Sequence, residues 1–541
     1  MTSKKNVAAL MVAMVLGVST TAMAMPLEKT GTGFAKNVIV LIPDGMSQDG
    51  VTLTRWLYND GAPLSIDSIA SGLVRTHNSD TAIADSAPAG TAMSTGHKTQ
   101  DKLIAVKGKA ATLYGSNKDD LKEAFSPLAS ILELAKLQGK ATGIVATSEI
   151  MHATPADFSA HAVNRKNYND ISEQQVFQNM NVVLGGGYKF FTTAEREDKQ
   201  DLIAEMKLQG YQLVSDKKQL NSVKDGKVFG LFATADLPYE LDREDDEPAL
   251  SELTGKAIEL LSKDKDGFFL MVEGSKVDWA AHDNAPAALA GDIKAFDDAV
   301  GVALNYAKSN KDTLIVVASD HGNGGITMGN GATNGNYSTL PISVFTDTLK
   351  KVGMTEEKLA KVITKNKTQT SSLIQENFGF APTDAELQSV MQADSEKGKM
   401  QALRTILNKR SNLGWTTGGH TGEDVALYVY ANDYKNQLTG TVQNSDIAKY
   451  VAKAMGGDLE QASSKLFVPS AGFAKYGVKC VVDSSDAKNP VFVLSKNGHS
   501  YKFQENRNYF EGPEGKVSFN GIVVYNGNEV FVPQEALRLL K

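Results

Sequence analysis

Val38-Ile-Val-Leu-Ile-Pro-Asp44-Gly45 is a run of five apolar residues that ends in a proline, a carboxylate and a glycine. A continuous apolar run, as opposed to an alternating one, predicts a strand buried on both faces of a sheet. Similar runs follow at residues 141–147, 268–272, 314–318 and 425–430. Helical patterns lie between them, for example at 130–138 and 251–262. This alternation predicts an α/β fold, a three-layer α/β/α sandwich with a mainly parallel central sheet.

Three carboxylates follow closely after these predicted strands. Asp44 comes after the first run, Glu273 after the run at 268–272, and Asp320 after the run at 314–318. Ligands of open α/β sheets gather at the carboxyl ends of the strands. The three side chains are therefore expected to lie close together.

Downstream of Glu273, the segment Asp278-Trp279-Ala-Ala-His282 places a carboxylate and an imidazole four residues apart. On a helix the two side chains share one face and can hold one metal ion, and the ligand types suit zinc or another first-row metal. Taken alone, such a pair is more often a surface hydrogen bond. The nearby Glu273 strengthens the metal-site interpretation.

A serine stands at the start of another predicted helix. Within Thr81-Ala-Ile-Ala-Asp85-Ser86-Ala-Pro-Ala-Gly-Thr-Ala-Met-Ser-Thr95-Gly96, residues 87–95 have helical character. Ser86 would then lie at a helix N-terminus, where free N–H groups favour phosphate. A serine hydroxyl needs a base or a metal to become a nucleophile. The alternative is that Ser86 only caps the helix.

Three further segments complete a set of motifs: His152-Ala-Thr154-Pro155 with Arg165 eleven residues after Thr154, Ser319-Asp320-His321-Gly322, and Gly418-Gly419-His420-Thr421-Gly422. In content and order the whole set resembles the alkaline phosphatase family, from about Asn37 to about Ala431. The resemblance implies hydrolysis of phosphate monoesters to alcohol and inorganic phosphate through a phosphoserine, with an alkaline pH optimum. It also implies two zinc ions and a third metal, usually magnesium.

The resemblance also implies roles for individual residues. Ser86 is the implied nucleophile, Arg165 the clamp on two phosphate oxygens, and Asp85 the side chain that orients Arg165. The implied ligands are Asp278, His282 and His420 for the first zinc; Asp44, Asp320 and His321, beside Ser86, for the second; and Asp44, Thr154 and Glu273 for the third metal.

Two positions depart from the pattern of some family members, which have aspartate and lysine where this chain has His152 and Trp279. Both are implied to lie at the substrate. Because Trp279 supplies no charge, we hypothesise weaker binding of inorganic phosphate and less product inhibition. His152 leaves the identity of the third metal open.

Two rival functions stay open at this stage. One is another activity of the same superfamily, a phosphodiesterase or a sulfatase, because Ser86-Ala-Pro88-Ala-Gly90 is similar to the sulfatase signature except that Gly90 replaces its arginine. The other is a non-catalytic protein that binds metal or phosphate. The complete set of implied ligands argues against the second.

The remaining sequence indicates where the protein works and how it is divided. Residues 1–24 read as a signal peptide, with Lys4 and Lys5 before an apolar core and Ala22-Met23-Ala24 as the cleavage site. The mature form is expected to have no membrane span and to reach the periplasm, in preference to the medium. A net charge of −7 argues against a nucleic-acid partner. The single cysteine, Cys480, excludes an internal disulfide.

Residues 25–464 are expected to form the catalytic domain, with a large, mostly helical insertion at 322–419. Residues 465–541 are expected to form a small β-rich domain with hairpins at Asn497-Gly498, Asn520-Gly521 and Asn526-Gly527. The family resemblance implies a homodimer, for which the insertion is a candidate interface.

Overall fold

A computed structural model describes residues 33–483, 485–486 and 489–541. The predicted signal peptide at 1–24 lies outside these residues. Within them, no helix combines the length and the apolar character needed to cross a membrane.

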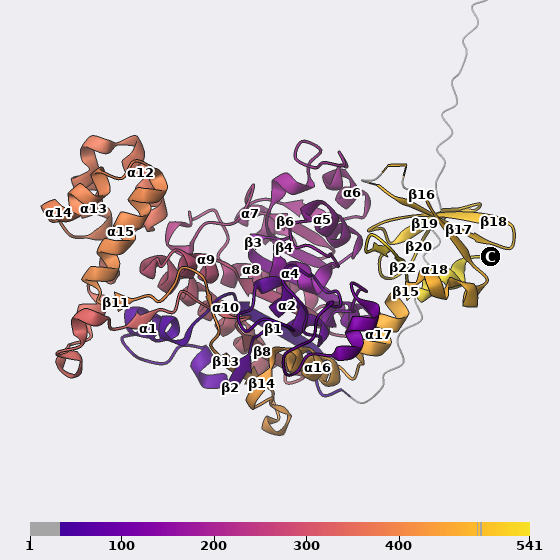
Figure 1. Ribbon diagram of the computed structural model, residues 1–541, viewed down its shortest axis with the longest axis horizontal. Helices are drawn as coiled ribbons and strands as arrows, with labels where there is room; N and C mark the ends of the chain where they lie inside the picture. The colour runs from indigo at the N-terminus through magenta and orange to yellow at the C-terminus, as the bar shows by residue number, and fades with distance from the viewer. Residues whose placement is uncertain (1–32, 484, 487–488) are drawn as a thin grey trace, which may run out of the picture.

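The centre of the molecule is a ten-stranded sheet in the order β14-β2-β13-β8-β1-β7-β3-β4-β6-β5 (Figure 1). All neighbours pair in parallel except β13, which is antiparallel to both β2 and β8. The five predicted strands are confirmed. The strand bounds are β1 (Asn37–Pro43), β2 (Ala70–Arg75), β3 (Ala141–Glu149), β4 (Val182–Gly186), β5 (Gln212–Val214), β6 (Val228–Leu231), β7 (Phe268–Gly274), β8 (Thr313–Ala318), β13 (Val425–Tyr430) and β14 (Gly440–Gln443).

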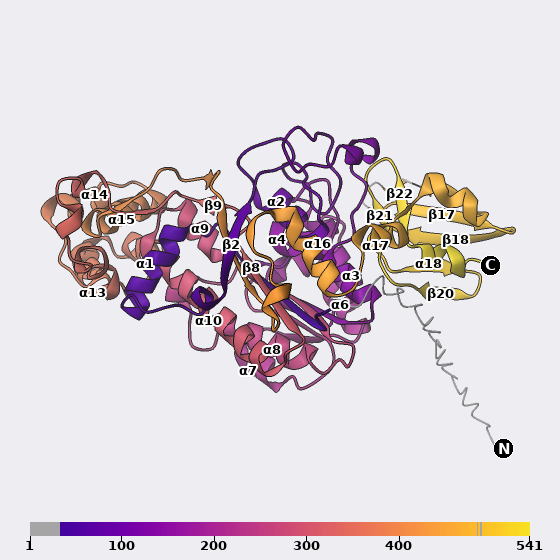
Figure 2. The same ribbon diagram turned by 90° about the horizontal axis from the view of Figure 1, so that it is seen from below.

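Helices cover both faces of this sheet, as the sandwich prediction requires (Figure 2). Each face has its own cluster of buried apolar side chains. On one face lie α1 (Gln48–Asn59), α8 (Leu250–Leu261), α9 (Lys276–His282) and α10 (Pro286–Ser309). On the other lie α2 (Ser86–Thr95), α3 (Ile131–Leu137), α4 (Ala153–Ser159), α5 (Tyr168–Phe177), α16 (Asn444–Ala454) and α17 (Leu459–Leu466), with α6 (Leu202–Leu208).

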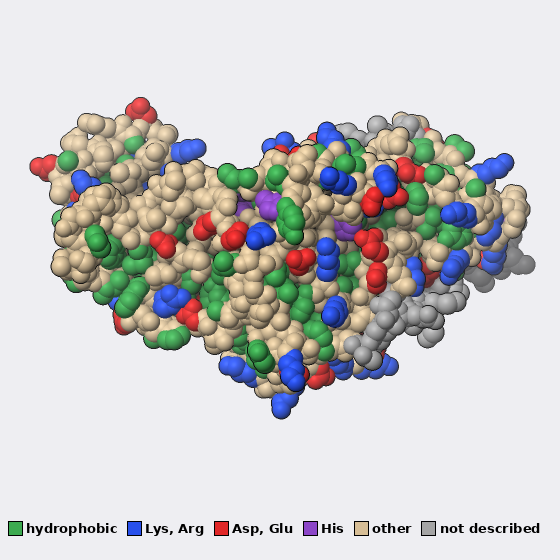
Figure 3. Space-filling view, turned by 60° about the horizontal axis from the view of Figure 1, so that its bottom comes forward, with side chains coloured by type: hydrophobic (Ala, Val, Ile, Leu, Met, Phe, Trp, Pro, Cys, Tyr) green, Lys and Arg blue, Asp and Glu red, His purple; other side chains and the backbone are tan. Residues whose placement is uncertain are grey.

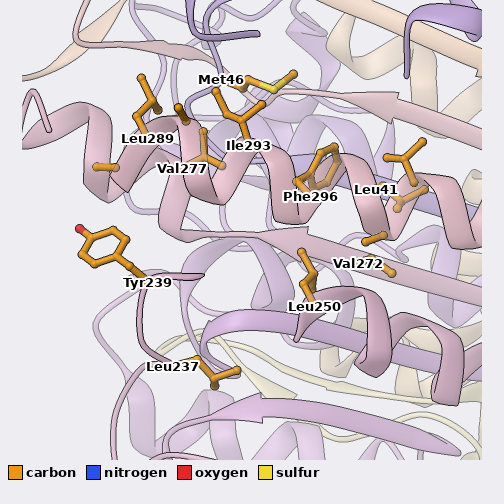
Figure 4. Close-up of a cluster of buried hydrophobic side chains, with 14 of the residues drawn as sticks. Leu41, Met46, Leu237, Tyr239, Leu250, Val272, Val277, Leu289, Ile293 and Phe296 are labelled. Carbon is orange, nitrogen blue, oxygen red and sulfur yellow. The ribbon is translucent and has the colours of Figure 1, made fainter. Parts of the chain in front are cut away.

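The long helix α10 anchors the first of these clusters (Figure 4). Its Phe296 is fully buried in the same cluster as Leu41 of β1 and Val272 of β7. The β7 strand ends at Gly274, where an added Cβ would lie 2.9 Å from the Phe296 ring. A Phe→Ala change at such a position costs about 3–5 kcal/mol. This packing fixes the strand ends of β1 and β7 next to each other.

The predicted insertion forms a helical lobe at one end of the molecule (Figure 1). Short strand pairs connect it to the body: β9 (Gly322–Asn323) with β12 (His420–Thr421), and β10 (Thr327–Met328) with β11 (Leu413–Gly414). Its helices are α11 (Ser343–Thr346), α12 (Glu356–Lys365), α13 (Thr370–Phe378), α14 (Asp384–Met391) and α15 (Glu396–Arg410). α14 begins with the capping box of Thr383 and Glu386.

The C-terminal region is β-rich, as predicted, and lies at the opposite end (Figure 1). It has its own buried cluster around Phe492 and Phe503. One sheet contains β16 (Lys479–Asp483), β17 (Val491–Lys496), β18 (His499–Gln504), β19 (Tyr509–Gly512) and β20 (Gly515–Ser518); a second contains β15 (Val468–Pro469), β21 (Val524–Tyr525) and β22 (Val530–Val532), followed by α18 (Gln534–Leu539).

The hairpin turns of this region are confirmed at two of three positions. Asn497-Gly498 joins β17 to β18, and Asn526-Gly527 joins β21 to β22. The expectation for Asn520-Gly521 is wrong, because this pair connects strands of two different sheets. Cys480 is a free, half-buried residue on β16.

Candidate active site

The carboxylates that follow the central strands lie together at one edge of the sheet. β1 pairs with β7 on one side and β8 on the other, all in parallel, so their carboxyl ends coincide. Ligand atoms of Asp44, Asp320 and His321 lie within 4.8 Å of one another, and so do those of Asp44, Glu273 and His152. The shared member of both groups, Asp44, has no exposed surface.

Gly45 explains how a helix can approach this edge. Its φ of +66° lies in the left-handed region. An added Cβ there would lie 2.5 Å from Oδ1 of Asp278. Glycine therefore permits both the turn after β1 and the close approach of α9, which carries Asp278 and His282 on one face as the spacing predicted.

Histidines His282 and His420 face each other across Asp278. Their Nε2 atoms are 3.1 Å apart and lie 3.4 Å and 3.6 Å from the Asp278 carboxylate oxygens. Each ring contacts a backbone carbonyl through Nδ1, at 2.9 Å to Gly418 and 2.7 Å to Ala84. A carbonyl accepts only from N–H, so Nδ1 carries the proton and both Nε2 lone pairs point at one spot. That is the orientation of metal-ligating histidines.

His321 lies between the two halves of the cluster. It stacks on His420 with ring centroids 3.6 Å apart, and it joins Asp278 and His420 in a third group of close ligand atoms. Its Nε2 is 3.1 Å from Asp320 and 3.5 Å from Asp44.

Ser86 is the first residue of helix α2. The N-cap is Asp85, whose backbone is extended, so Ser86 is not the capping residue. Its side chain is buried and its Oγ lies 3.2 Å from Nε2 of His321. The serine hydroxyl is thus held against the Asp44–Asp320–His321 group.

The charges of this cluster are strongly coupled. Burial, with Asp320, Asp278 and Glu273 nearby, raises the pKa of Asp44 well above its usual range. Burial also raises the pKa of Glu273 to about 7. Burial lowers the pKa of His321, but the adjacent Asp320 outweighs it and raises that pKa to about 9.

Several buried oxygens of the cluster have no hydrogen-bond partner within the described part of the chain. Among the described residues, both carboxylate oxygens of Asp44, one each of Glu273 and Asp320, and the Thr154 hydroxyl are buried without a hydrogen bond. Buried polar atoms almost always have a partner, and carboxylates next to one another repel. Carboxylate, hydroxyl and imidazole donors fit zinc and magnesium ions. The residues present therefore suit the metals that the sequence implied.

Arg165 lies beside the cluster with two partners. Its Nη1 donates to Asp85 at 2.6 Å, and its Nη2 is 3.0 Å from Nε2 of His152. Arginine has no lone pair to offer, so it donates and His152 accepts. Burial and, next, Arg165 lower the pKa of His152 to about 3. The neutral ring then carries its proton on Nδ1.

Trp279 and a lysine that the sequence analysis did not single out form the wall behind His152. The rings of Trp279 and His152 meet edge to face with centroids 5.8 Å apart. Nζ of Lys276 lies 4.1 Å above the Trp279 ring and 4.6 Å above that of Tyr239. The same ammonium is paired with Asp236. The sequence signal that could have identified Lys276 is its position one helical turn before Trp279.

Asn323 is the second site residue that the sequence analysis missed. Its Nδ2 donates to Oδ1 of Asp278 at 2.6 Å and so fixes that carboxylate. The position directly follows His321-Gly322, which was the available signal.

Gly90 stands where the sulfatase signature has an arginine, and the structure shows why this position suits glycine. A Cβ at Gly90 would collide with the Asp157 carboxylate. No arginine side chain could start from this position, so the replacement seen in the sequence is built into the packing of α2 against α4.

The chain is similar to known proteins of one family. The family model described as alkaline phosphatase matches residues 35–456. Alkaline phosphatase 3 of Bacillus subtilis is 40% identical over 440 residues, which cover 78% of this chain and 89% of that protein.

Solved structures give the same result. The cold-active alkaline phosphatase of a psychrophilic Shewanella species superimposes with a TM-score of 0.68 at 30% identity, covering 77% of this chain and 99% of that one. A variant of the alkaline phosphatase from TAB5, in which a histidine is replaced by glutamate and magnesium is bound in its M3 site, has a TM-score of 0.56 at 27% identity, covering 79% and 99%.

Proposed function

This chain belongs to the alkaline phosphatase family and is a phosphomonoesterase, and we propose that the cluster at the ends of β1, β7 and β8 carries out the reaction with Ser86 as nucleophile. The observation that carries this proposal is the contact of 3.2 Å between the buried Ser86 hydroxyl and His321, within a group of carboxylates and imidazoles. Ser86 Oγ attacks phosphorus, the ester bond to the alcohol breaks, and a phosphoserine forms. Water then displaces Ser86 and releases inorganic phosphate.

The position of Ser86 at the start of α2 favours this chemistry. Free backbone N–H groups of the first helical turn and the helix dipole attract the phosphate oxygens. Because the two displacements both occur in line, the configuration at phosphorus is retained.

Arg165 binds two equatorial oxygens of the transferred group. Its planar guanidinium suits this bidentate task. Asp85 and His152 hold it from the far side, through the bonds described above. Fixed positive charge of this kind stabilises a phosphoryl transition state without reorganisation during the reaction.

The alkaline phosphatase family depends on metal ions, and we propose that this chain binds two zinc ions and one magnesium ion. Asp278, His282 and His420 would hold one zinc, and Asp44, Asp320 and His321 the other, next to Ser86. When bound, they supply Lewis-acid charge that lowers the pKa of the serine hydroxyl and offsets charge on the leaving oxygen.

The third metal would be held by Asp44, Thr154 and Glu273. His152 also lies close to Asp44 and Glu273. Its Nε2 lone pair is already used by Arg165, however, so His152 would act beside the ion and not as a ligand. Two carboxylates and a hydroxyl supply the oxygen ligands that magnesium prefers.

We also propose the broader setting of the protein. Residues 1–24 would direct export to the periplasm, and residues 25–464 would form the catalytic domain with its insertion at 322–419. Residues 465–541 would form a separate domain, which their own hydrophobic cluster supports. Two chains would form a homodimer, as the resemblance implies.

The test is hydrolysis of a chromogenic phosphate monoester at alkaline pH by wild type and Ser86→Ala, on protein of known metal content. We expect about two zinc ions per chain and a loss of kcat on the order of 10³-fold or more in the variant. Ser94→Ala is the matched control, because Ser94 lies on the same helix and its hydroxyl bonds only to the backbone carbonyl of Thr91. Full activity in Ser86→Ala would refute the serine mechanism. Turnover of a diester or a sulfate ester in preference to the monoester would favour the rival activities.

A further inference from the structure

A cavity of about 530 Å³ opens from Arg165 toward the surface. Asp85, His152 and Arg165 line its inner part. Its outer part is lined by residues without a role in the proposed reaction: Asp101, Lys102, Lys166, Tyr168 and Phe190. The volume lies within the range of small-molecule sites. A phosphate ester whose phosphate reaches Arg165 would have its alcohol portion within reach of these outer residues.

Tyr168 and Phe190 form an aromatic pair in this outer part. Their rings meet edge to face with centroids 5.0 Å apart. Tyr168 is the first residue of α5, three residues after Arg165, and Phe190 lies in the 3-10 turn η3 (Tyr188–Phe191) after β4. Both side chains are partly buried and still line the cavity, so their rings are held in place while part of their surface stays open.

Basic side chains lie near the aromatic pair. Nζ of Lys189 lies 4.8 Å above the Phe190 ring. Lys166 is exposed, next to Arg165 in the chain, and lines the cavity. The exposed Lys102 is paired with Asp101 at 3.4 Å. Dianionic phosphate esters are attracted to such an entrance in a salt-dependent way.

Backbone bonds make this entrance rigid. The N–H of Arg165 donates to the carbonyl of Lys102 at 2.8 Å, and Ile104 and Ala162 exchange bonds of 2.9 and 3.0 Å. The N–H of Tyr188 donates to Ala233 at 3.1 Å. The aromatic pair is thus fixed relative to Arg165 before any ligand arrives, which lowers the entropy cost of binding.

We propose that this outer cavity is a leaving-group site for phosphate monoesters with a planar aromatic group, and that nucleoside 5′-monophosphates are the preferred substrate class. The proposal rests on the proposed placement of phosphate at Arg165. The base stacks on the open surface of the aromatic pair, while Lys166, which lines the cavity, attracts the anion. A purely polar leaving group, such as a sugar, has no planar face to stack on either ring.

The test compares adenosine 5′-monophosphate with ribose 5-phosphate, which presents the same alcohol without the base. In wild type we expect kcat/KM to be about tenfold higher for the nucleotide, from the usual strength of base–aromatic stacking. Tyr168→Leu and Phe190→Leu keep apolar volume and remove the ring face, so each should reduce this ratio severalfold. Lys166→Gln should flatten the salt dependence of kcat/KM for both substrates.

Matched controls come from neighbouring residues. Tyr188 is an exposed aromatic residue two positions from Phe190 that is absent from the cavity lining. Tyr188→Leu should leave the nucleotide preference unchanged. Lys365→Gln, on α12 in the distant insertion lobe, should leave the salt dependence unchanged.

Three results would overturn the proposal: no nucleotide preference in wild type, an unchanged preference in both leucine variants, or an equal loss in Tyr188→Leu. If a leucine variant does not fold, competitive inhibition of ribose 5-phosphate hydrolysis by adenosine in wild type serves instead, and its absence counts against the site. Turnover of ribose 5-phosphate without nucleotide preference would refute only this site. Failure of the metal-loaded enzyme on both substrates would refute the proposed function itself.

Discussion

Lys276 lies beside Trp279 and already has partners of its own. Its Nζ lies over the Trp279 ring and is paired with Asp236, so its charge is largely compensated. The sequence-based hypothesis of weak phosphate binding therefore remains reasonable even though a lysine lies nearby.

We predict that Trp279→Lys lowers the inhibition constant of inorganic phosphate about three- to tenfold, because an ammonium group then faces the bound anion. The measurement is competitive inhibition of monoester hydrolysis by phosphate at fixed pH. Trp279→Phe, which adds no charge, should not lower the constant. An unchanged constant in Trp279→Lys would refute the hypothesis.

Asn323 tests the importance of ligand orientation. Asn323→Ala removes the 2.6 Å bond to Asp278, and loss of such an outer partner typically costs about 10–100-fold in metal affinity. Competition for zinc with a chelator measures this directly. Asn377→Ala, which removes an amide bonded only to the Leu373 carbonyl in the insertion, is the control. Equal zinc affinity in both variants would contradict the prediction.

At the scale of residues, the sequence predicted the site members whose chemical role requires a recognisable spacing. Asp44, Asp278 and Asp320 could be placed because they follow strands or share a helix face. Lys276 and Tyr168 could not, because a lysine near a tryptophan and an aromatic residue opening a helix look like ordinary surface and core. Their significance depends on contacts between segments far apart in the chain.

At the scale of elements, His97 connects the end of α2 to two other segments. Its ring contacts Asp120 of the turn η2 (Lys118–Glu123) at 2.9 Å and Glu460 of α17 at 2.8 Å. Burial lowers its pKa, but the two carboxylates outweigh this and raise the pKa to about 9. The imidazolium therefore holds α2, and with it Ser86, against η2 and α17.

We predict a pH-dependent loss of stability in His97→Gln. The folded-state pKa lies above the ordinary value of about 6.5, so the stabilisation is complete below pH 6.5 and disappears as the pH rises through about 9. The variant should lose on the order of 2 kcal/mol of unfolding free energy near pH 6 and much less near pH 10. Denaturant unfolding at both pH values measures this. His499→Gln, at an exposed histidine, should show no such difference; a loss in His97→Gln that is equal at both pH values would exclude the charged pair.

The elements themselves were largely predictable, because short continuous apolar runs that alternate with helical patterns are typical of a sheet covered on both faces. The direction of β13 was not, since a buried strand has the same composition in either orientation. The turn at Asn520-Gly521 failed for a similar reason: its residues suit a tight turn but do not specify which strands it connects.

At the scale of the whole molecule, the helical lobe and the C-terminal region lie at opposite ends of the body that contains the central sheet (Figure 1). Figure 3 shows histidine side chains reaching the surface near the middle of one face. The apolar core stabilises the body that holds these side chains. The neighbouring buried carboxylates of the cluster repel one another and lower its stability unless a cation is present.

We predict that chelation lowers the melting temperature of the zinc- and magnesium-loaded protein by roughly 5–15 °C, because ions that bind only the folded state stabilise it by mass action. Calorimetry before and after chelation measures the change, and addition of zinc and magnesium should restore it. An unchanged melting temperature after verified metal removal would show that the cluster does not depend on cations.

The pairing of β1 has a consequence for the timing of folding. Val38 pairs with Phe269 on one side and with Leu314 on the other, so the first strand of the body waits for partners that lie far along the chain. Contacts of such long range form slowly. A chain that emerges N-terminus first therefore cannot pair β1 on both sides until β7 and β8 have been made. The centre of the sheet stays open until β8 has been synthesised, which would suit the export proposed above.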